Sequence, residues 1–155
     1  MLHRLILLVA VALAACSPAA PTPQYHASDN PQRLSDWGQL GLAGGELRLA
    51  AGVVPYDLNT PLFTDYALKL RTIWMPDGQT ATYREGEVLD FPVGTVITKT
   101  FYYPLADTPG QVARGDGHSL TRADGSLDLS QVRLIETRVL VHRETGWAAL
   151  PYRWN

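Results

Sequence analysis

Four carboxylates in this chain are candidates for acid–base chemistry: Asp57, Asp65, Asp90 and Glu136. Glycoside hydrolysis would need two of them to face each other across a substrate, one to donate a proton and one to act on the sugar or on water. Their positions in the sequence fix no distance between any two, so no pair can be selected. An enzyme that acts on a sugar or a similar polymer through Asp57 or Asp65 therefore stays an alternative.

Other reactive sites have weaker support in the sequence. The histidines after residue 15 are His26, His118 and His142, and their spacing builds no metal site by itself, although Asp116 stands two residues before His118. The sequence contains neither a Gly-x-Ser-x-Gly nucleophile motif nor a phosphate-binding Gly-Lys-Ser/Thr run. We therefore expect no metal site in this chain and favour a binding role over catalysis.

Aromatic side chains supply a second alternative, a sugar-binding module. Six of them stand on or near predicted strands: Trp74, Tyr102, Tyr103, Trp147, Tyr152 and Trp154. Exposed and coplanar rings on one face would stack on sugars, whereas buried rings would each supply about 150 to 250 Å² of core area. A small domain without disulfides needs that area, so burial is the favoured interpretation.

Cys16 is the sole cysteine of the chain and ends an uncharged apolar run, residues 5–15, which follows His3 and Arg4. This pattern is typical of a secretory signal. The run is shorter than the roughly 20 apolar residues that a membrane-spanning helix needs. The small residues before Cys16 are those at which a bacterial lipoprotein signal is cut. We therefore expect a lipoprotein signal peptide at residues 1–15 and lipidation of Cys16.

Lipidation at Cys16 predicts a protein of the bacterial cell envelope that is attached to a membrane through its lipid anchor. More than one acyl chain suffices for stable anchoring. Ser17 in place of an Asp follows the pattern of lipoproteins sorted to the outer membrane, so the domain is expected to face the periplasm. Residues 16–32 are rich in Pro and Ala and predict an extended tether.

The 155 residues include 13 basic and 15 acidic side chains, and the net charge is −2. The basic residues form no cluster or stripe, so nucleic acid is not an expected partner. With Cys16 committed to lipid, the chain has no thiol left for a disulfide, a thiolate metal site or covalent heme. Residues 33–155 suit a single domain held by packing.

The residue pattern of this domain predicts a mainly β fold, either an antiparallel β-sandwich or a partly closed barrel, preceded by the signal helix and the tether. Alternation, β-branched residues and turn residues predict strands at residues 69–75, 80–83, 95–103, 131–142 and 147–154. Residues 76–79 are expected to form a turn that joins the first two of these strands as a hairpin. Residues 34–38 predict a short helix or turn, and residues 53–63 an ordered, packed loop. Residues 104–129 are expected to form a long, exposed and mobile loop.

Four strings resemble, in the same order, the N-terminal region of a bacterial envelope family described as diheme c-type cytochromes: residues 52–69, 91–101, 134–138 and 146–155. In that family the Cys-x-x-Cys-His heme-attachment motifs lie beyond the matched region, and this chain contains none. Heme c is therefore expected only in the longer relatives. The resemblance implies either a truncated product or a free-standing β domain that works beside a c-type cytochrome or another envelope redox partner.

The resembling strings keep seven polar residues among apolar neighbours: Tyr56, Asp57, Asn59, Asp65, Lys99, Glu136 and Arg138. We interpret them as one hydrogen-bonded cluster that is either structural or the floor of a site. Glu136 and Arg138 share one strand face and could pair with each other or across strands. The leading hypothesis is a non-catalytic binding or docking module associated with c-type cytochrome electron transfer.

Overall fold

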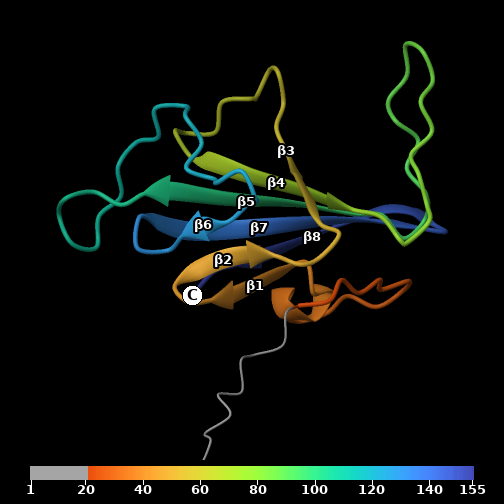
Figure 1. The fold of residues 1–155 in the computed structure, drawn as a ribbon, viewed down its shortest axis with the longest axis horizontal. Helices are drawn as coiled ribbons and strands as arrows, with labels where there is room; N and C mark the ends of the chain where they lie inside the picture. Colours follow the sequence, from red (N-terminus) through yellow and green to blue (C-terminus); the bar gives the residue numbers. More distant parts are fainter. Residues whose placement is uncertain (1–20) are drawn as a thin grey trace, which may run out of the picture.

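The computed structural model describes residues 21–155, which form two antiparallel β-sheets packed face to face (Figure 1). The smaller sheet has the order β1-β2-β6, with β1 at Leu40–Ala43, β2 at Glu46–Leu49 and β6 at Leu127–Asp128. The larger has the order β3-β4-β5-β7-β8, with β3 at Val54–Tyr56, β4 at Leu68–Trp74, β5 at Val96–Pro104, β7 at Val132–Arg143 and β8 at Gly146–Arg153.

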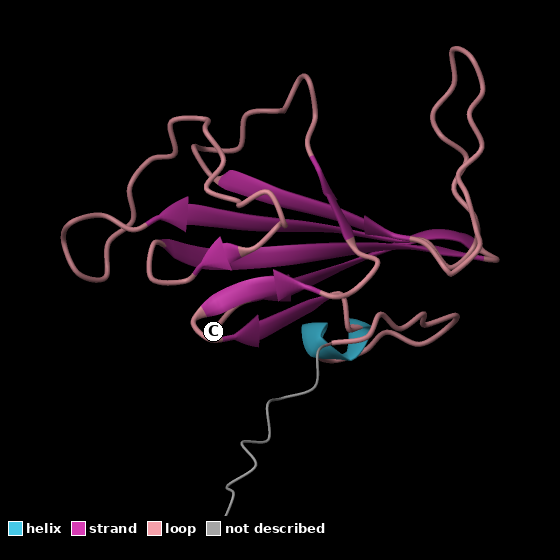
Figure 2. Ribbon diagram, viewed as in Figure 1, coloured by secondary structure: helices cyan, strands magenta, loops and turns pink. Residues whose placement is uncertain are grey.

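A short 3-10 helix, η1 (Leu34–Trp37), precedes the strands, where a short helix or turn was predicted (Figure 2). The mainly β class is confirmed. Over the described residues the two sheets stay separate, so the fold is the predicted β-sandwich and not the partly closed barrel. The predicted signal peptide at residues 1–15 and the lipidation site Cys16 lie outside the described residues.

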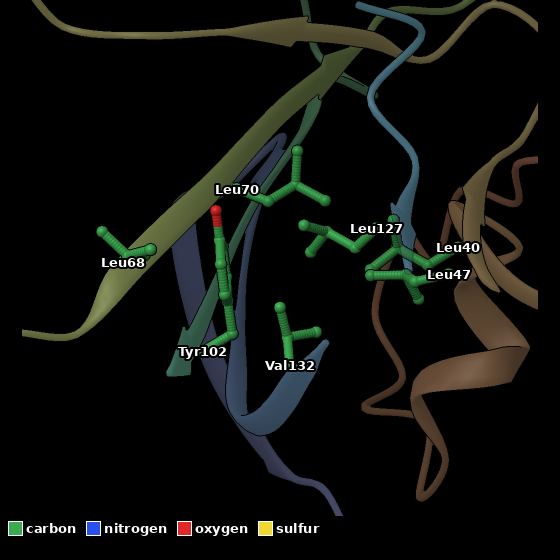
Figure 3. Packing of buried hydrophobic residues seen from close by; sticks show 7 residues of the cluster. All are labelled: Leu40, Leu47, Leu68, Leu70, Tyr102, Leu127 and Val132. Atoms are coloured by element: carbon green, nitrogen blue, oxygen red, sulfur yellow. The ribbon is translucent and has the colours of Figure 1, made fainter. Parts of the chain in front are cut away.

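The hydrophobic core lies between the two sheets. Leu70 of β4 and Tyr102 of β5 belong to one buried cluster with Leu47 of β2 and Leu127 of β6 (Figure 3). Burial of a large apolar side chain contributes about 1.5 to 3 kcal/mol. Because side chains alternate along a strand, the residues between these core positions must face away from the smaller sheet.

A second cluster forms around Trp37, which is fully buried against β5 and β7. The indole Nε1 of Trp37 donates a hydrogen bond to Tyr152 Oη at 2.8 Å, and Tyr152 Oη donates to the Pro31 carbonyl at 2.8 Å. Arg143 donates to the carbonyls of His26 and Asp29. The described part of the segment expected to be a tether therefore already contacts the domain, because Trp37 and Arg143 give it a packed surface and hydrogen bonds.

The three C-terminal strand predictions are confirmed: residues 95–103, 131–142 and 147–154 correspond to β5, β7 and β8. The prediction of a hairpin between residues 69–75 and 80–83 is wrong. The turn at Pro76 forms, with Gln79 N donating to the Pro76 carbonyl, but β4 pairs with β5 instead. Residues 75–95 leave the sheet as a long excursion (Figure 1) in which a single bridge joins Thr82 to Asp90. Tyr83 there is exposed, so a strand at 80–83 would bury little apolar surface.

Two loop predictions need correction. Residues 53–63 contain the edge strand β3, and the residues after it are not packed, since Leu62 and Phe63 are both exposed. An edge position is compatible with Pro55, which has no N–H to donate. Residues 104–129 are mostly exposed but end in β6, whose Leu127 enters the core and pairs with Leu47.

Candidate functional site

The face of the larger sheet that points away from the smaller sheet, here called the outer face, carries a row of polar residues. Tyr56 of β3 lies opposite Arg71 of β4, Arg71 opposite Lys99 of β5, and Lys99 opposite Arg138 of β7. Directly opposed residues point to the same side of a sheet. These four residues, the basic row, therefore place three cations side by side on neighbouring strands.

The next row of outer-face residues along the strands contacts two of these cations. Phe101 of β5 lies opposite Glu136 of β7 and is only 7% exposed. Lys99 Nζ lies 5.3 Å, and the Arg138 guanidinium 4.9 Å, from the centroid of the Phe101 ring. A ring face attracts cations. Arg138 also forms an ion pair with Glu136, so both cations are held above the sheet in a defined arrangement.

Arg71 is the most enclosed member of the basic row. Its side chain is 7% exposed, and its Nη1 lies 2.7 Å from Oδ1 of Asp57, whose side chain is 69% exposed. Lys69 lies two residues before Arg71, on the same face of β4. Its Nζ donates a hydrogen bond to the Leu62 carbonyl at 2.7 Å. The loop of residues 57–67 therefore closes over this corner of the sheet through one ion pair and one hydrogen bond.

Cations outnumber carboxylates at this site. Burial lowers the pKa of Lys99, and the charges of Arg138 and Arg71 lower it further, while Glu136 opposes them. The pKa of Lys69 is lowered by burial, then by Arg71 and Lys99. Within residues 21–155 no group accepts a hydrogen bond from Lys99 Nζ. The unbalanced positive charge favours an anionic group from another molecule.

An apolar row lies beside the basic row on the outer face. Its members are opposed across the five strands in this order: Val54, Ile73, Ile97, Leu140 and Ala149. Next to it, Trp147 stacks on His142 with ring centroids 4.6 Å apart, and Trp147 is 43% exposed. An apolar patch with a charged border is the composition of a protein-binding surface.

The structure brings together five of the seven predicted site residues. Tyr56, Lys99, Glu136 and Arg138 share the outer face, and Asp57 joins them through its ion pair with Arg71.

The other two residues do not join this group. Asn59 and Asp65 lie in the 57–67 loop, and within the described residues neither side chain forms a hydrogen bond or ion pair. The predicted single hydrogen-bonded cluster is therefore replaced by two ion pairs, Asp57 with Arg71 and Glu136 with Arg138, in a cation-rich surface.

Three residues of the site were not singled out from the sequence: Lys69, Arg71 and Phe101. The signal was present in part, because Lys69 and Arg71 alternate with apolar residues along β4 and must share a face. Their position beside Lys99 depends on the pairing of β4 with β5. That pairing could not be predicted while residues 80–83 were expected to be the partner of β4.

The geometry gives less support to a sugar-binding module or a metal site. Of the six aromatic residues considered for sugar stacking, Tyr102 is fully buried, four are partly buried, and only Trp147, 43% exposed, lies open to solvent. Over residues 21–155, no three His, Cys, Asp or Glu side chains converge as metal ligands would. No helix within that range has both the length and the apolar character needed to cross a membrane.

No described protein family matches the chain, and neither does any curated protein or any solved structure. The relationship to the diheme cytochromes is therefore carried by the four sequence strings alone and stays a prediction.

Proposed function

We propose that this protein is a non-catalytic docking module of the bacterial envelope, and that its outer face binds an acidic surface of a c-type cytochrome or another redox partner. The single observation that carries the proposal is the basic row, in which Arg71, Lys99 and Arg138 stand on three neighbouring strands beside an open apolar row. The chain itself would hold no heme.

The two rows suit a transient complex. Cations that lack enough carboxylates attract an acidic partner and orient it during encounter, which raises the association rate more than the final affinity. The apolar row, with exposed Leu140, then supplies the contact area that excludes water. Complexes of redox proteins commonly have small and weak interfaces.

The direction in which the chain enters the fold supports this role. Pro21 and Thr22 lie against Gly41 and Gly38, on the side of the smaller sheet. The outer face lies on the opposite side of the sandwich (Figure 1). If Cys16 carries lipid in the outer membrane, as proposed from the sequence, the anchor would leave the outer face free for a periplasmic partner.

The test is retention of a heme protein by the full-length chain purified in mild detergent from its own envelope. We expect a heme-staining band and Soret absorbance to co-purify with the wild type and to be lost at high salt. The double variant Lys99→Glu/Arg138→Glu should lose the heme protein. The control Arg33→Glu/Arg84→Glu makes the same charge change at two exposed arginines off the outer face and should retain it. Equal retention by both variants would refute the proposal.

A further inference from the structure

A cleft of about 380 Å³ lies beside the start of β4, where residues 68–70 have no partner on β3, between the 57–67 loop and the loop of residues 113–121. Its polar lining includes Asp57, Lys69, Arg71, Asp116 and Ser119. A neighbouring hollow of about 280 Å³ shares four of these residues and adds Tyr56 and Arg122. The cleft has the size of a small-molecule site.

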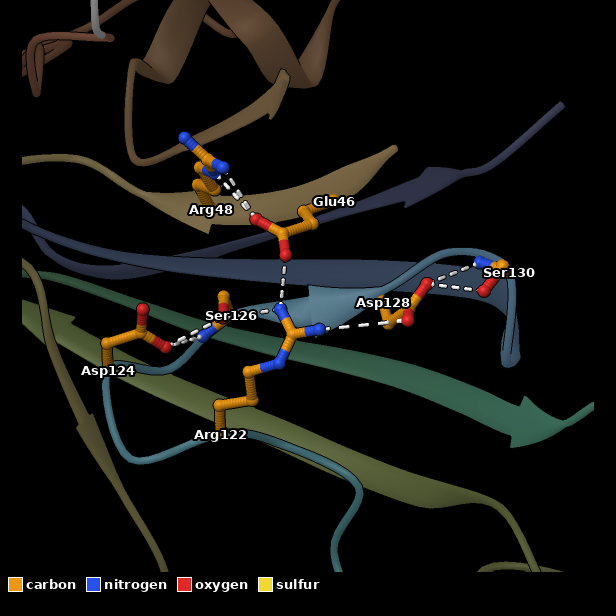
Figure 4. Close-up of polar contacts among 7 residues, drawn as sticks. All are labelled: Glu46, Arg48, Arg122, Asp124, Ser126, Asp128 and Ser130. Carbon is orange, nitrogen blue, oxygen red and sulfur yellow. Dashed lines mark hydrogen bonds and ion pairs between the residues drawn. The ribbon is translucent and has the colours of Figure 1, made fainter. Parts of the chain in front are cut away.

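The walls of this cleft are held by specific contacts. Gly115 N donates to the Tyr66 carbonyl at 3.0 Å, which joins the two loops. The hydroxyl of buried Tyr102 accepts a hydrogen bond from Leu120 N at 3.1 Å. Arg122, at the end of the second loop, forms ion pairs with Glu46 and Asp128 (Figure 4). Contacts between the chain's own residues therefore define the shape of the cleft.

The charges in the cleft define what could bind there. Arg71 has five N–H donors, and within residues 21–155 one of its nitrogens, Nη1, is bonded to Asp57. Its remaining N–H groups and the Lys69 ammonium can donate hydrogen bonds to a carboxylate. Asp57 and Asp116 in the same lining would repel a second negative charge but can accept hydrogen bonds from hydroxyl groups. The lining therefore fits a ligand with one carboxylate and several hydroxyls better than it fits phosphate.

The rim adds an apolar contact. Phe63 and Tyr66 both line the cleft, and their rings meet edge to face with centroids 5.1 Å apart. Phe63 is exposed, and Tyr66 also contacts Arg114 through its ring. Exposed rings of this kind can cover the apolar C–H face of a sugar.

We propose that this cleft binds an acidic sugar of the hexuronate type, with its carboxylate on Arg71 and Lys69 and its hydroxyls on Asp116 and Ser119. The free sugar and the terminal residue of a uronate polymer present the same chemistry. The cleft shares Arg71 with the basic row but uses neither the apolar row nor Arg138, so variants of its other lining residues can test it separately from the docking role.

The test is calorimetric titration of the full chain in detergent with glucuronate, galacturonate, glucose, acetate and inorganic phosphate. We expect a uronate to bind at least tenfold more tightly than each of the last three probes. Galacturonate oligomers run in parallel separate the two sources, since a polymer-end site binds them more tightly than the monomer. A uronate that binds no better than glucose or acetate would overturn the proposal.

Variants identify the site. Lys69→Met and Asp116→Asn should each weaken uronate binding about tenfold or more, while Arg33→Gln, at an exposed arginine far from the cleft, should leave it unchanged. Melting curves of each variant check that the fold persists. Uronate binding that survives both Lys69→Met and Asp116→Asn in folded protein would also overturn the proposal. Loss of uronate binding with an unchanged heme-protein partner would leave the docking role intact.

Discussion

Lys99 on β5 and Arg138 on β7 are directly opposed, and both cations lie over the ring of Phe101. Like charges opposed across strands destabilise a sheet. Here Glu136 offsets part of the repulsion through its ion pair with Arg138, but Lys99 has no acidic partner of its own within residues 21–155. Like charges that lower the stability of the fold on an exposed face are typical of a functional surface.

Replacing Lys99 with Met should stabilise the fold while weakening partner binding. The folded-state pKa of Lys99 is lowered, so its charge costs stability below the ordinary value of 10.5, a range that includes neutral pH. Met keeps the apolar contact with Phe101 and removes the charge. We expect the free energy of unfolding at pH 7 to rise by about 0.5 to 1 kcal/mol. A fall in that free energy, measured by urea unfolding, would show that Lys99 stabilises the sheet.

The ion pair of Asp57 with Arg71 should matter more than other ion pairs near the surface. Asp57→Asn leaves the enclosed Arg71 guanidinium without its carboxylate, and we expect a loss of about 1 to 2 kcal/mol of unfolding free energy. The matched control is Arg84→Gln, which breaks the looser contacts of Arg84 with Glu87 and Asp90. Exposed pairs of that kind contribute about 0 to 1 kcal/mol. Equal urea midpoints for the two variants would contradict this ranking.

The carboxylates that tie β2 and β6 to the 113–126 region should make the protein sensitive to acid (Figure 4). The pKa of Glu46 is lowered by its hydrogen bonds to Arg48 and Arg122. Hydrogen bonds from Ser126 lower the pKa of Asp124, and hydrogen bonds from Ser130 lower that of Asp128.

Proton linkage gives the direction in which stability changes with pH. A carboxyl whose folded pKa is lowered binds fewer protons in the native state than in the unfolded state, so its contribution is complete above its ordinary pKa. That ordinary value is 4.5 for Glu46 and 3.8 for the two aspartates. The contribution is lost as the pH falls through the folded values. Melting curves between pH 7 and pH 2 should show this loss, and Glu46→Gln should make the acid slope shallower. An unchanged slope would show that Glu46 does not contribute to the acid sensitivity.

Tyr152 should hold the N-terminal segment on the sandwich. Tyr152→Phe removes the acceptor of Trp37 Nε1 and the donor to the Pro31 carbonyl. Because Trp37 is fully buried, its unpaired N–H should cost about 1 to 3 kcal/mol of unfolding free energy. Hydrogen exchange at Gln24, whose N–H bonds the Trp37 carbonyl, should speed up in the variant. Exchange at wild-type rates would mean that other contacts hold this segment.

The sequence predicted the parts of the fold that depend on neighbouring residues. Strands β5, β7 and β8 follow from their β-branched and aromatic runs, and the pairing of Glu136 with Arg138 follows from their two-residue spacing. Long-range relationships could not be obtained in this way. The register that sets Arg71 beside Lys99 spans the whole 75–95 excursion, and a local turn at Pro76 wrongly suggested a nearer partner.

The same reason explains the unforeseen contacts of the Pro-rich segment and the missed residues of the site. Pro-rich composition predicts an extended segment but says nothing of Arg143 and Tyr152, which hold that segment from distant parts of the chain. Lys69 and Arg71 become part of the site through their contacts with the 57–67 loop, which folds over them. Tertiary contacts thus decided which polar residues form the site.

The most direct test of the docking role is photo-crosslinking in the native envelope from two exposed leucines, one on the outer face and one on the smaller sheet. Leu140 lies in the apolar row, 37% exposed, and Leu42 on β1 of the smaller sheet is 58% exposed. A photoreactive amino acid replaces one or the other in the full-length chain. We predict a heme-staining cross-linked product from position 140 and none from position 42. A heme-staining product from position 42 alone, or none from position 140, would contradict the assignment of the outer face as the docking surface.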